Sequence, residues 1–278
     1  MDKKQEVEPF LRFLKDRFES KIDSKKYFLS YSGGKDSHFL LWFIKEYLHD
    51  YDIEIVGCNT SFEIPEVRDR ITTYSDTVLH PAMNRWNIKE RYGIPCFSKQ
   101  QDEYIYRYQT GNRSENTMRA IMGKNTLFNL NKTARELLLS EQLHKVSNKC
   151  CYFNKELPMI RYAKKTGKKS IIGVRQSESK TRKAKYDSCL RKSGNFTPIY
   201  DFSDELMNAI YEAYEIEVPR CYTYIHRSGC AGCPYSRNCE SELALLPELQ
   251  RRAAVKYFKE SYDVKHINYQ NLQEVIIF

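Results

Sequence analysis

Short apolar runs alternate with longer helical patterns near the N-terminus, and this alternation constrains the fold most. Residues 27–30 and 53–57 are apolar runs of strand length, and residues 36–49 between them are apolar on nearly every side. Pro65 then stands where a helix can begin, because its missing N–H would be unsatisfied there in any case. The helical pattern continues to residue 80. Strand, helix, strand and helix in this order predict a parallel sheet with right-handed crossovers.

The rest of the chain extends this α/β pattern. It adds a helix at 4–20, a strand at 169–174, a further strand near 196–202, and helices at about 203–214 and 241–260. We expect three parts: an N-terminal helix at 1–26, a nucleotide-binding α/β domain at 27–200 with a helical insert at about 81–148, and a helical C-terminal part at 201–278 that carries a metal-binding cysteine loop.

Composition excludes several classes of protein. With 41% hydrophobic residues, 21 Tyr and 14 Phe, the chain can bury a real core, which excludes a disordered protein. No run approaches the roughly 18 apolar residues of a membrane helix, so no membrane association is expected. The N-terminal stretch MDKKQEVEPFLRFL is charged and lacks the apolar core of a signal peptide. These features predict a cytoplasmic protein.

The net charge of +9 and two basic stretches, 164–170 and 180–192, leave two interpretations open. A positive face attracts polyanions such as DNA or RNA, and also nucleotides and sulfate esters. An ordinary solvated surface explains such runs equally well.

The stretch SYSGGKDS at 30–37 follows the first strand and opens the first buried helix. Such a loop lies at the carboxyl edge of a parallel sheet, where ligands bind. Gly33 and Gly34 allow close backbone approach, and the following helix offers free N–H groups to an anion. Lys35 adds a charge. A carboxylate at Asp36 suits this place only beside a cation, so we expect Mg²⁺ between Asp36 and a polyphosphate.

The stretch is not a Walker A loop, because the G-x-x-x-x-G-K-[ST] spacing is absent. SGGKDS resembles the PP-loop of the ATP pyrophosphatase superfamily, which has a parallel-sheet adenine nucleotide α-hydrolase-like fold. Members of that superfamily cleave ATP between the α- and β-phosphates to adenylate a substrate, or bind an adenylyl-sulfate. The resemblance implies bound ATP and Mg²⁺.

Three further stretches resemble the phosphoadenylyl-sulfate (PAPS) reductase-like branch of this superfamily. NTSFEIPEV (59–67) is similar to its LDTGxxFPET element, with Asn59 in place of the aspartate. KCCYFNKELPMIR (149–161) is similar to KCCxxxKxxPL, and IIGVRQSESKTR (171–182) to GxRxxESxxR. The resemblance implies that Arg175 and Arg182 bind phosphate or sulfate through their planar guanidinium groups. The expected nucleotide-binding residues are Ser30, Ser32, Gly33, Gly34, Lys35, Asp36, Ser37, Asn59, Thr60, Gly173 and Arg175.

Nine cysteines in a reducing compartment point to metal or redox chemistry rather than disulfides. Two tetrads can bind a metal centre. The favoured set is Cys221, Cys230, Cys233 and Cys239, because all four lie in one short stretch whose spacing resembles DndC, the PP-loop protein of DNA phosphorothioation. The alternative set is Cys150, Cys151, Cys230 and Cys233, which resembles the arrangement in cluster-bearing adenylyl-sulfate reductases.

Four cysteine ligands are compatible with two kinds of metal centre. Four thiolates suit a [4Fe–4S] cluster, which the family resemblance favours, and they also suit Zn²⁺. With the favoured tetrad, Cys150 and Cys151 become candidate sulfur carriers, whose thiol pKa Lys149 and Lys155 would lower. Ordinary packing is the competing interpretation of this pair.

Taken together, the sequence predicts an ATP-dependent sulfurtransferase acting on nucleic acid, either DNA or tRNA, with Lys35, Asp36, Arg175, Arg182 and Cys151 as catalytic residues. A sulfur-donor protein such as a cysteine desulfurase is an expected partner. One alternative is an adenylyl-sulfate or phosphoadenylyl-sulfate reductase-type enzyme, which the lack of a cysteine after Cys239 disfavours. A second alternative is a non-catalytic nucleotide-binding subunit of a larger complex.

Overall fold

The computed structural model describes residues 2–125, 128–178, 180–226 and 228–270. Contacts divide the chain into two compact units. The first unit comprises Met1–Asn59, Pro65–His80 and Met159–Tyr222, and the second comprises Thr60–Ile64, Pro81–Pro158 and Thr223–Phe278. The segment expected to be a helical insert therefore shares a unit with most of the cysteine-bearing part. No helix within the described ranges is long and apolar enough to cross a membrane.

The first unit is built on a parallel four-stranded sheet. Its strands are β1 (Tyr27–Tyr31), β2 (Glu54–Cys58), β3 (Thr77–Leu79) and β4 (Lys169–Ile172), in the spatial order β3-β2-β1-β4. Every pairing is parallel, and Leu29 of β1 lies between Ile55 and Ile171 in register. The predicted α/β class with a parallel sheet is confirmed.

Three elements differ from the expectation, the first of them beside β2. The helix that begins at Pro65, α3, ends at Tyr74 rather than at residue 80. The Asp76 carboxylate accepts a hydrogen bond from the Ile55 N–H at 2.8 Å, and this contact turns the chain into β3. The β-branched Thr77 and Val78 then pair with β2, which a helical reading of the pattern missed.

The other two differences involve proline. In the described part of 196–202, Phe196 forms only isolated bridges, with Ile171 and with Leu190, and Pro198 has no N–H to extend a ladder. The helix expected at 241–260 is two helices, α12 (Cys239–Ala244) and α13 (Glu248–Lys265), because Pro247 lies between them.

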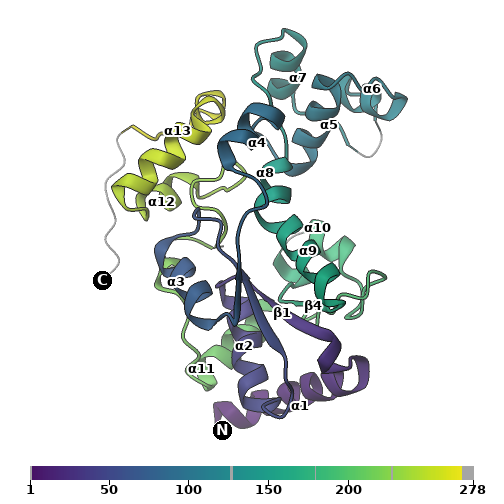
Figure 1. Cartoon of the computed structure of the whole chain (residues 1–278), viewed down its shortest axis with the longest axis vertical. Coiled ribbons are helices and arrows are strands. Elements are labelled where there is room, and N and C mark those ends of the chain that lie inside the picture. Colours follow the sequence, from purple (N-terminus) through teal and green to yellow (C-terminus); the bar gives the residue numbers. More distant parts are fainter. Residues whose placement is uncertain (1, 126–127, 179, 227, 271–278) are drawn as a thin grey trace. The chain divides into compact units, whose positions relative to one another are not determined.

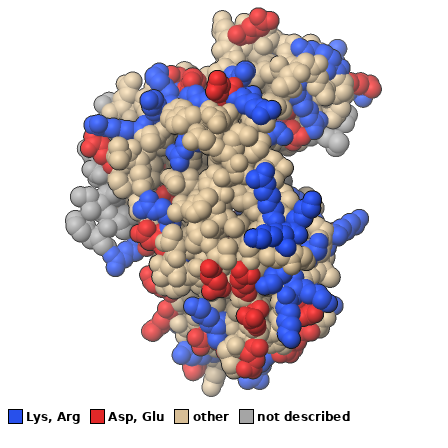
Figure 2. All heavy atoms as spheres, in the orientation of Figure 1, with Lys and Arg blue, Asp and Glu red and all other residues tan. Residues whose placement is uncertain are grey.

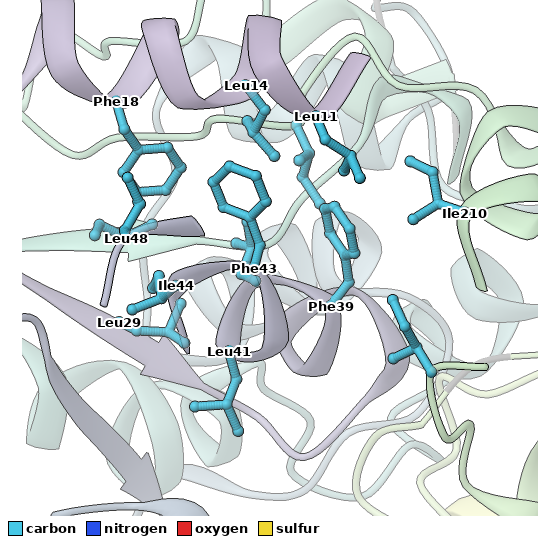
Figure 3. Packing of buried hydrophobic residues seen from close by; sticks show 14 of the residues in the cluster. Leu11, Leu14, Phe18, Leu29, Phe39, Leu41, Phe43, Ile44, Leu48 and Ile210 are labelled. Carbon is cyan, nitrogen blue, oxygen red and sulfur yellow. The ribbon is translucent and has the colours of Figure 1, made fainter. Parts of the chain in front are cut away.

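The core of the first unit lies between the sheet and the helices α1 (Lys3–Lys21), α2 (Lys35–Tyr47) and α11 (Asp204–Ala213). Helix α1 packs against α11 (Figure 1). Figure 3 shows Leu14 and Phe18 of α1 pointing toward Phe43 of α2. The rings of Phe18 and Phe43 lie 5.7 Å apart. These aromatic contacts fix α2, and α2 begins at the predicted phosphate loop.

On the other face of the sheet, α9 (Leu157–Thr166) packs its Tyr162 ring edge-on against Phe28 of β1. The first unit also contains α10 (Lys180–Lys185) and short 3₁₀ turns at Ser24–Lys26, Gln176–Glu178 and Arg220–Thr223.

The second unit is helical in its described residues. Its elements are α4 (Arg85–Tyr92), α5 (Lys99–Gln109), α6 (Glu115–Ile121), α7 (Lys132–Leu139), α8 (Lys149–Cys151), a π-helical turn at Tyr152–Glu156, α12 and α13. Its core includes Ile105 of α5 and Leu138 of α7. The helical reading of 81–148 is confirmed.

Candidate functional site

The turn between β1 and α2 has the backbone geometry of an anion site. Gly33 has a φ of 71°, in the left-handed region, and Gly34 is the N-cap of α2 in an extended conformation. Gly34 supplies no side-chain cap to this helix end. The Lys35 N–H donates to the Tyr222 hydroxyl at 3.2 Å, and the next N–H groups of α2, at Asp36 and Ser37, lie where the helix dipole favours an anion.

Two serines hold this turn in shape. Ser37 donates a hydrogen bond from Oγ to the Gly34 carbonyl at 2.9 Å and accepts one from the Ser32 N–H at 3.2 Å. The Ser32 and Ser37 hydroxyl oxygens lie 3.0 Å apart. These contacts preorganise the loop, so a ligand would not have to order it.

Gly33 is required by space as well as by conformation. A Cβ added there would lie 2.5 Å from the Val67 carbonyl oxygen of α3. We expect Gly33→Ala to lower the free energy of unfolding by more than the about 1 kcal/mol that a positive φ alone costs alanine. The matched control is Gly167→Ala, which has the same φ of 71° and nothing within 4 Å of the added Cβ. Equal urea denaturation midpoints for the two variants would contradict this.

Asp36 lies in the first turn of α2 and faces Arg175. Its Oδ2 lies 3.1 Å from Arg175 Nε, whose side chain is 2% exposed. The other face of the guanidinium contacts Asp204 Oδ1 at 2.5 Å. Asp36 Oδ1 is buried and, among the residues that the structure describes, has no hydrogen-bond partner. An unpaired buried carboxylate oxygen is costly, and a bound cation would satisfy it.

The two arginines of the predicted anion clamp have carboxylate partners. Burial alone lowers the pKa of Arg175, but the charges of Asp36 and Asp204 outweigh it, and the net pKa is raised. The Arg182 guanidinium is paired with Glu178, whose carboxylate also accepts a hydrogen bond from the Arg175 N–H at 3.2 Å. As placed, Arg175 positions Asp36 rather than facing solvent.

Of the other predicted loop-edge residues, one lies within a strand of the first unit, two follow such strands, and one belongs to the second unit. Ser30 is half-buried in β1, and Asn59 directly follows β2, donating its N–H to the Leu79 carbonyl. Gly173 follows β4, and a Cβ there would lie 3.0 Å from the backbone of Asp36. Thr60 belongs to the second unit, where it is buried.

Two residues at this edge escaped the sequence analysis. Tyr222 accepts a hydrogen bond from the Lys35 N–H at 3.2 Å, and the Lys35 ammonium lies 5.8 Å from its ring centroid. Asp204 lies in the first turn of α11 and holds Arg175. Neither stands in a motif, so only the folded chain associates them with the loop.

His38 of α2 carries a pH-dependent share of stability. Burial, and then the charge of Arg70, lower its pKa to about 4, and its Nδ1 lies 2.9 Å from the Tyr31 hydroxyl. The unfolded chain, with an ordinary pKa, binds this proton first as pH falls. Stability should therefore drop by up to about 3 kcal/mol between pH 6.5 and 4.

Urea denaturation midpoints measured across this pH range test the expectation. We expect His38→Gln to reduce the pH dependence, whereas His49→Gln, at a side chain that is 68% exposed, should leave it unchanged. An undiminished acid sensitivity in His38→Gln would contradict the assignment.

Four cysteines of the second unit lie close to one another. Cys150 and Cys151 are in α8, and Cys230 and Cys233 are in the segment before α12. Burial raises the pKa of Cys150 to about 12 and also raises those of Cys230 and Cys233, and in each case neighbouring cysteines of the set raise it further. These effects indicate that the thiols interact electrostatically where burial disfavours the thiolate. No group of three or more His, Cys, Asp or Glu side chains in the described ranges could hold a metal ion as placed.

Two polar side chains contact Cys150 of this set. Asn154 donates from Nδ2 to Cys150 Sγ at 3.1 Å, and the Tyr257 hydroxyl donates to the same sulfur at 3.8 Å. Neither residue was singled out in the sequence.

An ion pair between the partly exposed Lys155 and the buried Glu63 adds positive charge beside Cys230. Lys155 Nζ lies 3.4 Å from Glu63, whose side chain is 2% exposed. Burial lowers the pKa of Lys155, but Cys230 and Glu63 raise it more, so this lysine stays charged. The Thr60 hydroxyl donates to Glu63 at 2.7 Å and lies 4.0 Å from Cys230 Sγ.

The remaining two cysteines of the favoured tetrad have other neighbours. Cys221 belongs to the first unit and is fully buried, and its N–H donates to Glu66 at 2.9 Å. Cys239 donates from Sγ to the Gly232 carbonyl at 3.3 Å. Burial raises the pKa of each thiol to about 12. The alternative tetrad is thus the one that lies together within one unit.

The two basic stretches lie in the first unit. They supply exposed lysines at the end of α9, at the start of β4 and in α10. Figure 2 shows Lys and Arg side chains gathered over α9 and α10.

Comparison with known proteins identifies the family. Residues 26–235 match the family model of the phosphoadenosine phosphosulfate reductase domain. A search of the curated proteins found no match. Among solved structures, the chain is similar to phosphoadenylyl-sulfate (PAPS) reductase from Candida auris in its phosphate complex, with 11% identity and a TM-score of 0.38, over 77% of this chain and 89% of that one. Because the family match spans well over half of its length, the chain belongs to the phosphoadenosine phosphosulfate reductase domain family.

Proposed function

We propose that this protein is a PP-loop enzyme that binds ATP–Mg²⁺ and a [4Fe–4S] cluster and transfers sulfur to a nucleic acid. We place it in the cytoplasm, where its cysteines would stay reduced. The observation that carries the proposal is Asp36 Oδ1, a buried acceptor without a partner among the described residues, in the first turn of a helix whose N-cap residue, Gly34, supplies no side-chain cap. A bound cation would contact the Asp36 Oδ1 atom, and a bound anion would accept hydrogen bonds from the N-terminus of α2.

The loop after β1 fits a magnesium nucleotide. The N–H groups at the start of α2 would bind phosphate oxygens, with Lys35 adding a positive charge. Asp36 would hold Mg²⁺ through Oδ1 while Arg175 fixes its Oδ2. Bound Mg²⁺ neutralises charge on the polyphosphate, which makes pyrophosphate a better leaving group.

The thiols at Cys150, Cys151, Cys230 and Cys233 fit an iron–sulfur cluster better than zinc. Four ligands of one zinc ion must converge on a single atom, whereas each ligand of a cube binds a different iron and the sulfurs can stand farther apart. The described residues contain no preformed group that could hold a metal ion, so the preference for a cluster rests on this ligand chemistry and on the family resemblance. The donors Asn154 and Tyr257 at Cys150 Sγ would tune such a cluster, since hydrogen bonds to sulfur set its potential.

This ligand set conflicts with the role of Cys151 as a free sulfur carrier. A cysteine that ligates a cluster cannot also carry a terminal persulfide. We therefore assign the sulfur to a separate donor. A cysteine desulfurase would supply it as a persulfide, and a thiol reductant would release it as hydrosulfide, the thiols being oxidised to a disulfide.

The reaction would have two steps in this scheme. An acceptor oxygen attacks the α-phosphate of ATP, and pyrophosphate leaves. Hydrosulfide then displaces AMP, so the acceptor gains a C–S or P–S bond and loses the C–O or P–O bond. The choice of nucleic acid as acceptor rests on the net charge of +9 and on the two basic stretches at 164–170 and 180–192.

A reductase-type reaction on adenylyl-sulfate or phosphoadenylyl-sulfate is the second candidate. Two observations favour it: the family match at 26–235, and the closeness of Cys150–Cys151 to Cys230 and Cys233, the arrangement of cluster-bearing adenylyl-sulfate reductases. The same loop would then bind the sulfonucleotide.

One pair of assays separates the candidates. We expect anaerobically purified protein to release pyrophosphate from ATP–Mg²⁺ when hydrosulfide and DNA or tRNA are present. Sulfite release from adenylyl-sulfate with a thiol reductant would establish the reductase instead. Neither product, from protein with full iron content, would favour a non-catalytic subunit and overturn the proposal.

A further inference from the structure

The second unit contains a cavity of about 420 Å³, which is lined by α5 on one side and by α8 and the π-helical turn on the other. Two tyrosines, Tyr106 and Tyr152, and three cationic side chains, Lys99, Arg107 and Lys149, line it. Its volume falls in the range of small-ligand pockets, which begins near about 300 Å³. Aromatic faces beside cations are the combination that binds a base and its phosphate.

The tyrosine rings of α5 lie in different surroundings. Tyr104 and Tyr108 pack against the hydrophobic core of the second unit, and Tyr104 stacks on Phe128 with ring centroids 5.2 Å apart. Tyr106 is half-buried and lines the cavity. An amphipathic core face therefore explains two of these rings. The Tyr106 ring lies outside that core, 6.4 Å from the ring of Tyr92, and lines the cavity.

The cations of the cavity are weakly neutralised. Lys99 Nζ lies 3.7 Å from Glu156, and both side chains are more than half exposed. Arg107 is paired with Glu103 one turn away on α5. Such exposed pairs contribute little, so a phosphate can replace the carboxylate.

Lys149 contacts aromatic rings instead. Its Nζ lies 5.7 Å from the ring centroids of both Tyr106 and Tyr152, and the described residues place no carboxylate within ion-pair distance of it. The cavity thus contains Lys149, whose ammonium lies near two aromatic rings. It also contains Lys99 and Arg107, whose carboxylate partners a phosphate could replace.

We propose that this cavity binds one nucleotide, with the base on Tyr106 and the phosphate on Lys99 and Arg107. The nucleotide is either free or part of a single strand. An acidic peptide would use the cations but leave the two aromatic faces without a function. If the source is a strand, the cavity is where the nucleic-acid acceptor of the proposed function is held, and to that extent the inference rests on that function.

Fluorescence anisotropy of a labelled oligothymidylate of about ten nucleotides tests the proposal, without ATP or a sulfur donor, so failure of the sulfur chemistry would not affect the result. We expect Tyr106→Ala to weaken binding about 5- to 100-fold, as loss of one stacked base does, and Tyr106→Phe to bind like the wild type. We expect Lys99→Ala to flatten the salt dependence by about 0.7 in log–log slope, as loss of one phosphate contact does.

Lys132→Ala is the matched control for charge, because this lysine lies on α7 of the same unit with a side chain that is 88% exposed. AMP titration separates the two sources. AMP binding that depends on Tyr106, without strand binding, identifies a free nucleotide as the ligand. Binding of neither ligand, or equal binding by wild type, Tyr106→Ala and Lys132→Ala, would overturn the proposal.

Discussion

Replacing Asp36 by Asn should reduce Mg²⁺-dependent ATP turnover about 100-fold or more. Asparagine keeps the size of the side chain and the start of α2 but offers the metal a neutral ligand in place of a carboxylate. A lost electrostatic stabiliser in a poorly solvated site typically costs about 10² to 10³ in rate. The measurement is pyrophosphate release at several Mg²⁺ concentrations.

Asp204→Asn is the control that separates the loss of a carboxylate beside Arg175 from the loss of a metal ligand. Both substitutions remove one carboxylate from the same buried guanidinium, but only Asp36 has an unpaired buried oxygen among the described residues. We expect Asp204→Asn to retain the Mg²⁺ dependence of the wild type. If both variants lose activity equally, or if Asp36→Asn keeps it, Asp36 does not hold the metal.

Serine substitution at Cys150, Cys151, Cys230 or Cys233 should each abolish or severely reduce bound iron and the visible absorbance of the anaerobically purified protein. A cube has one protein ligand for each iron, so the loss of one thiolate exposes a corner to solvent and oxidation. Iron and zinc analysis of each variant, normalised to protein, is the measurement.

Cys221→Ser and Cys239→Ser are the matched controls, because both thiols are buried and have neighbours outside that set. We expect both variants to keep their iron. Loss of iron in these two variants, with iron retained in Cys150→Ser and Cys151→Ser, would reinstate the tetrad favoured by spacing. If the analysis finds zinc in place of iron, the four cysteines would remain the proposed metal ligands, but the protein would not hold an iron–sulfur cluster.

The sequence predicts the strand–loop–helix unit well because its signals are local. The apolar run of β1, the two glycines and the buried helix α2 all lie within residues 27–49. Strand β3 could not be predicted in this way. It has three residues, and it forms because Asp76 contacts β2, which is a property of the folded sheet.

The candidate site also has one part that is a local sequence motif and another part that only the fold brings together. The phosphate loop is one continuous motif, whereas the neighbouring thiols come from two segments far apart in the chain. Compact spacing favoured Cys221 and Cys239, yet Cys221 folds into the first unit with Glu66. The partners of the motif residues, such as Asp204 at Arg175 and Tyr257 at Cys150, carry no sequence signal, because their roles depend on tertiary contacts.

Diffraction from crystals soaked with a non-hydrolysable ATP analogue and Mn²⁺ tests the central claim most directly, since manganese can be located by its anomalous scattering. We expect the metal beside Asp36 Oδ1 and the phosphates on the N–H groups that open α2. An anomalous peak remote from Asp36, or phosphates bound elsewhere while that turn stays empty, would contradict the assignment of this loop as the nucleotide site.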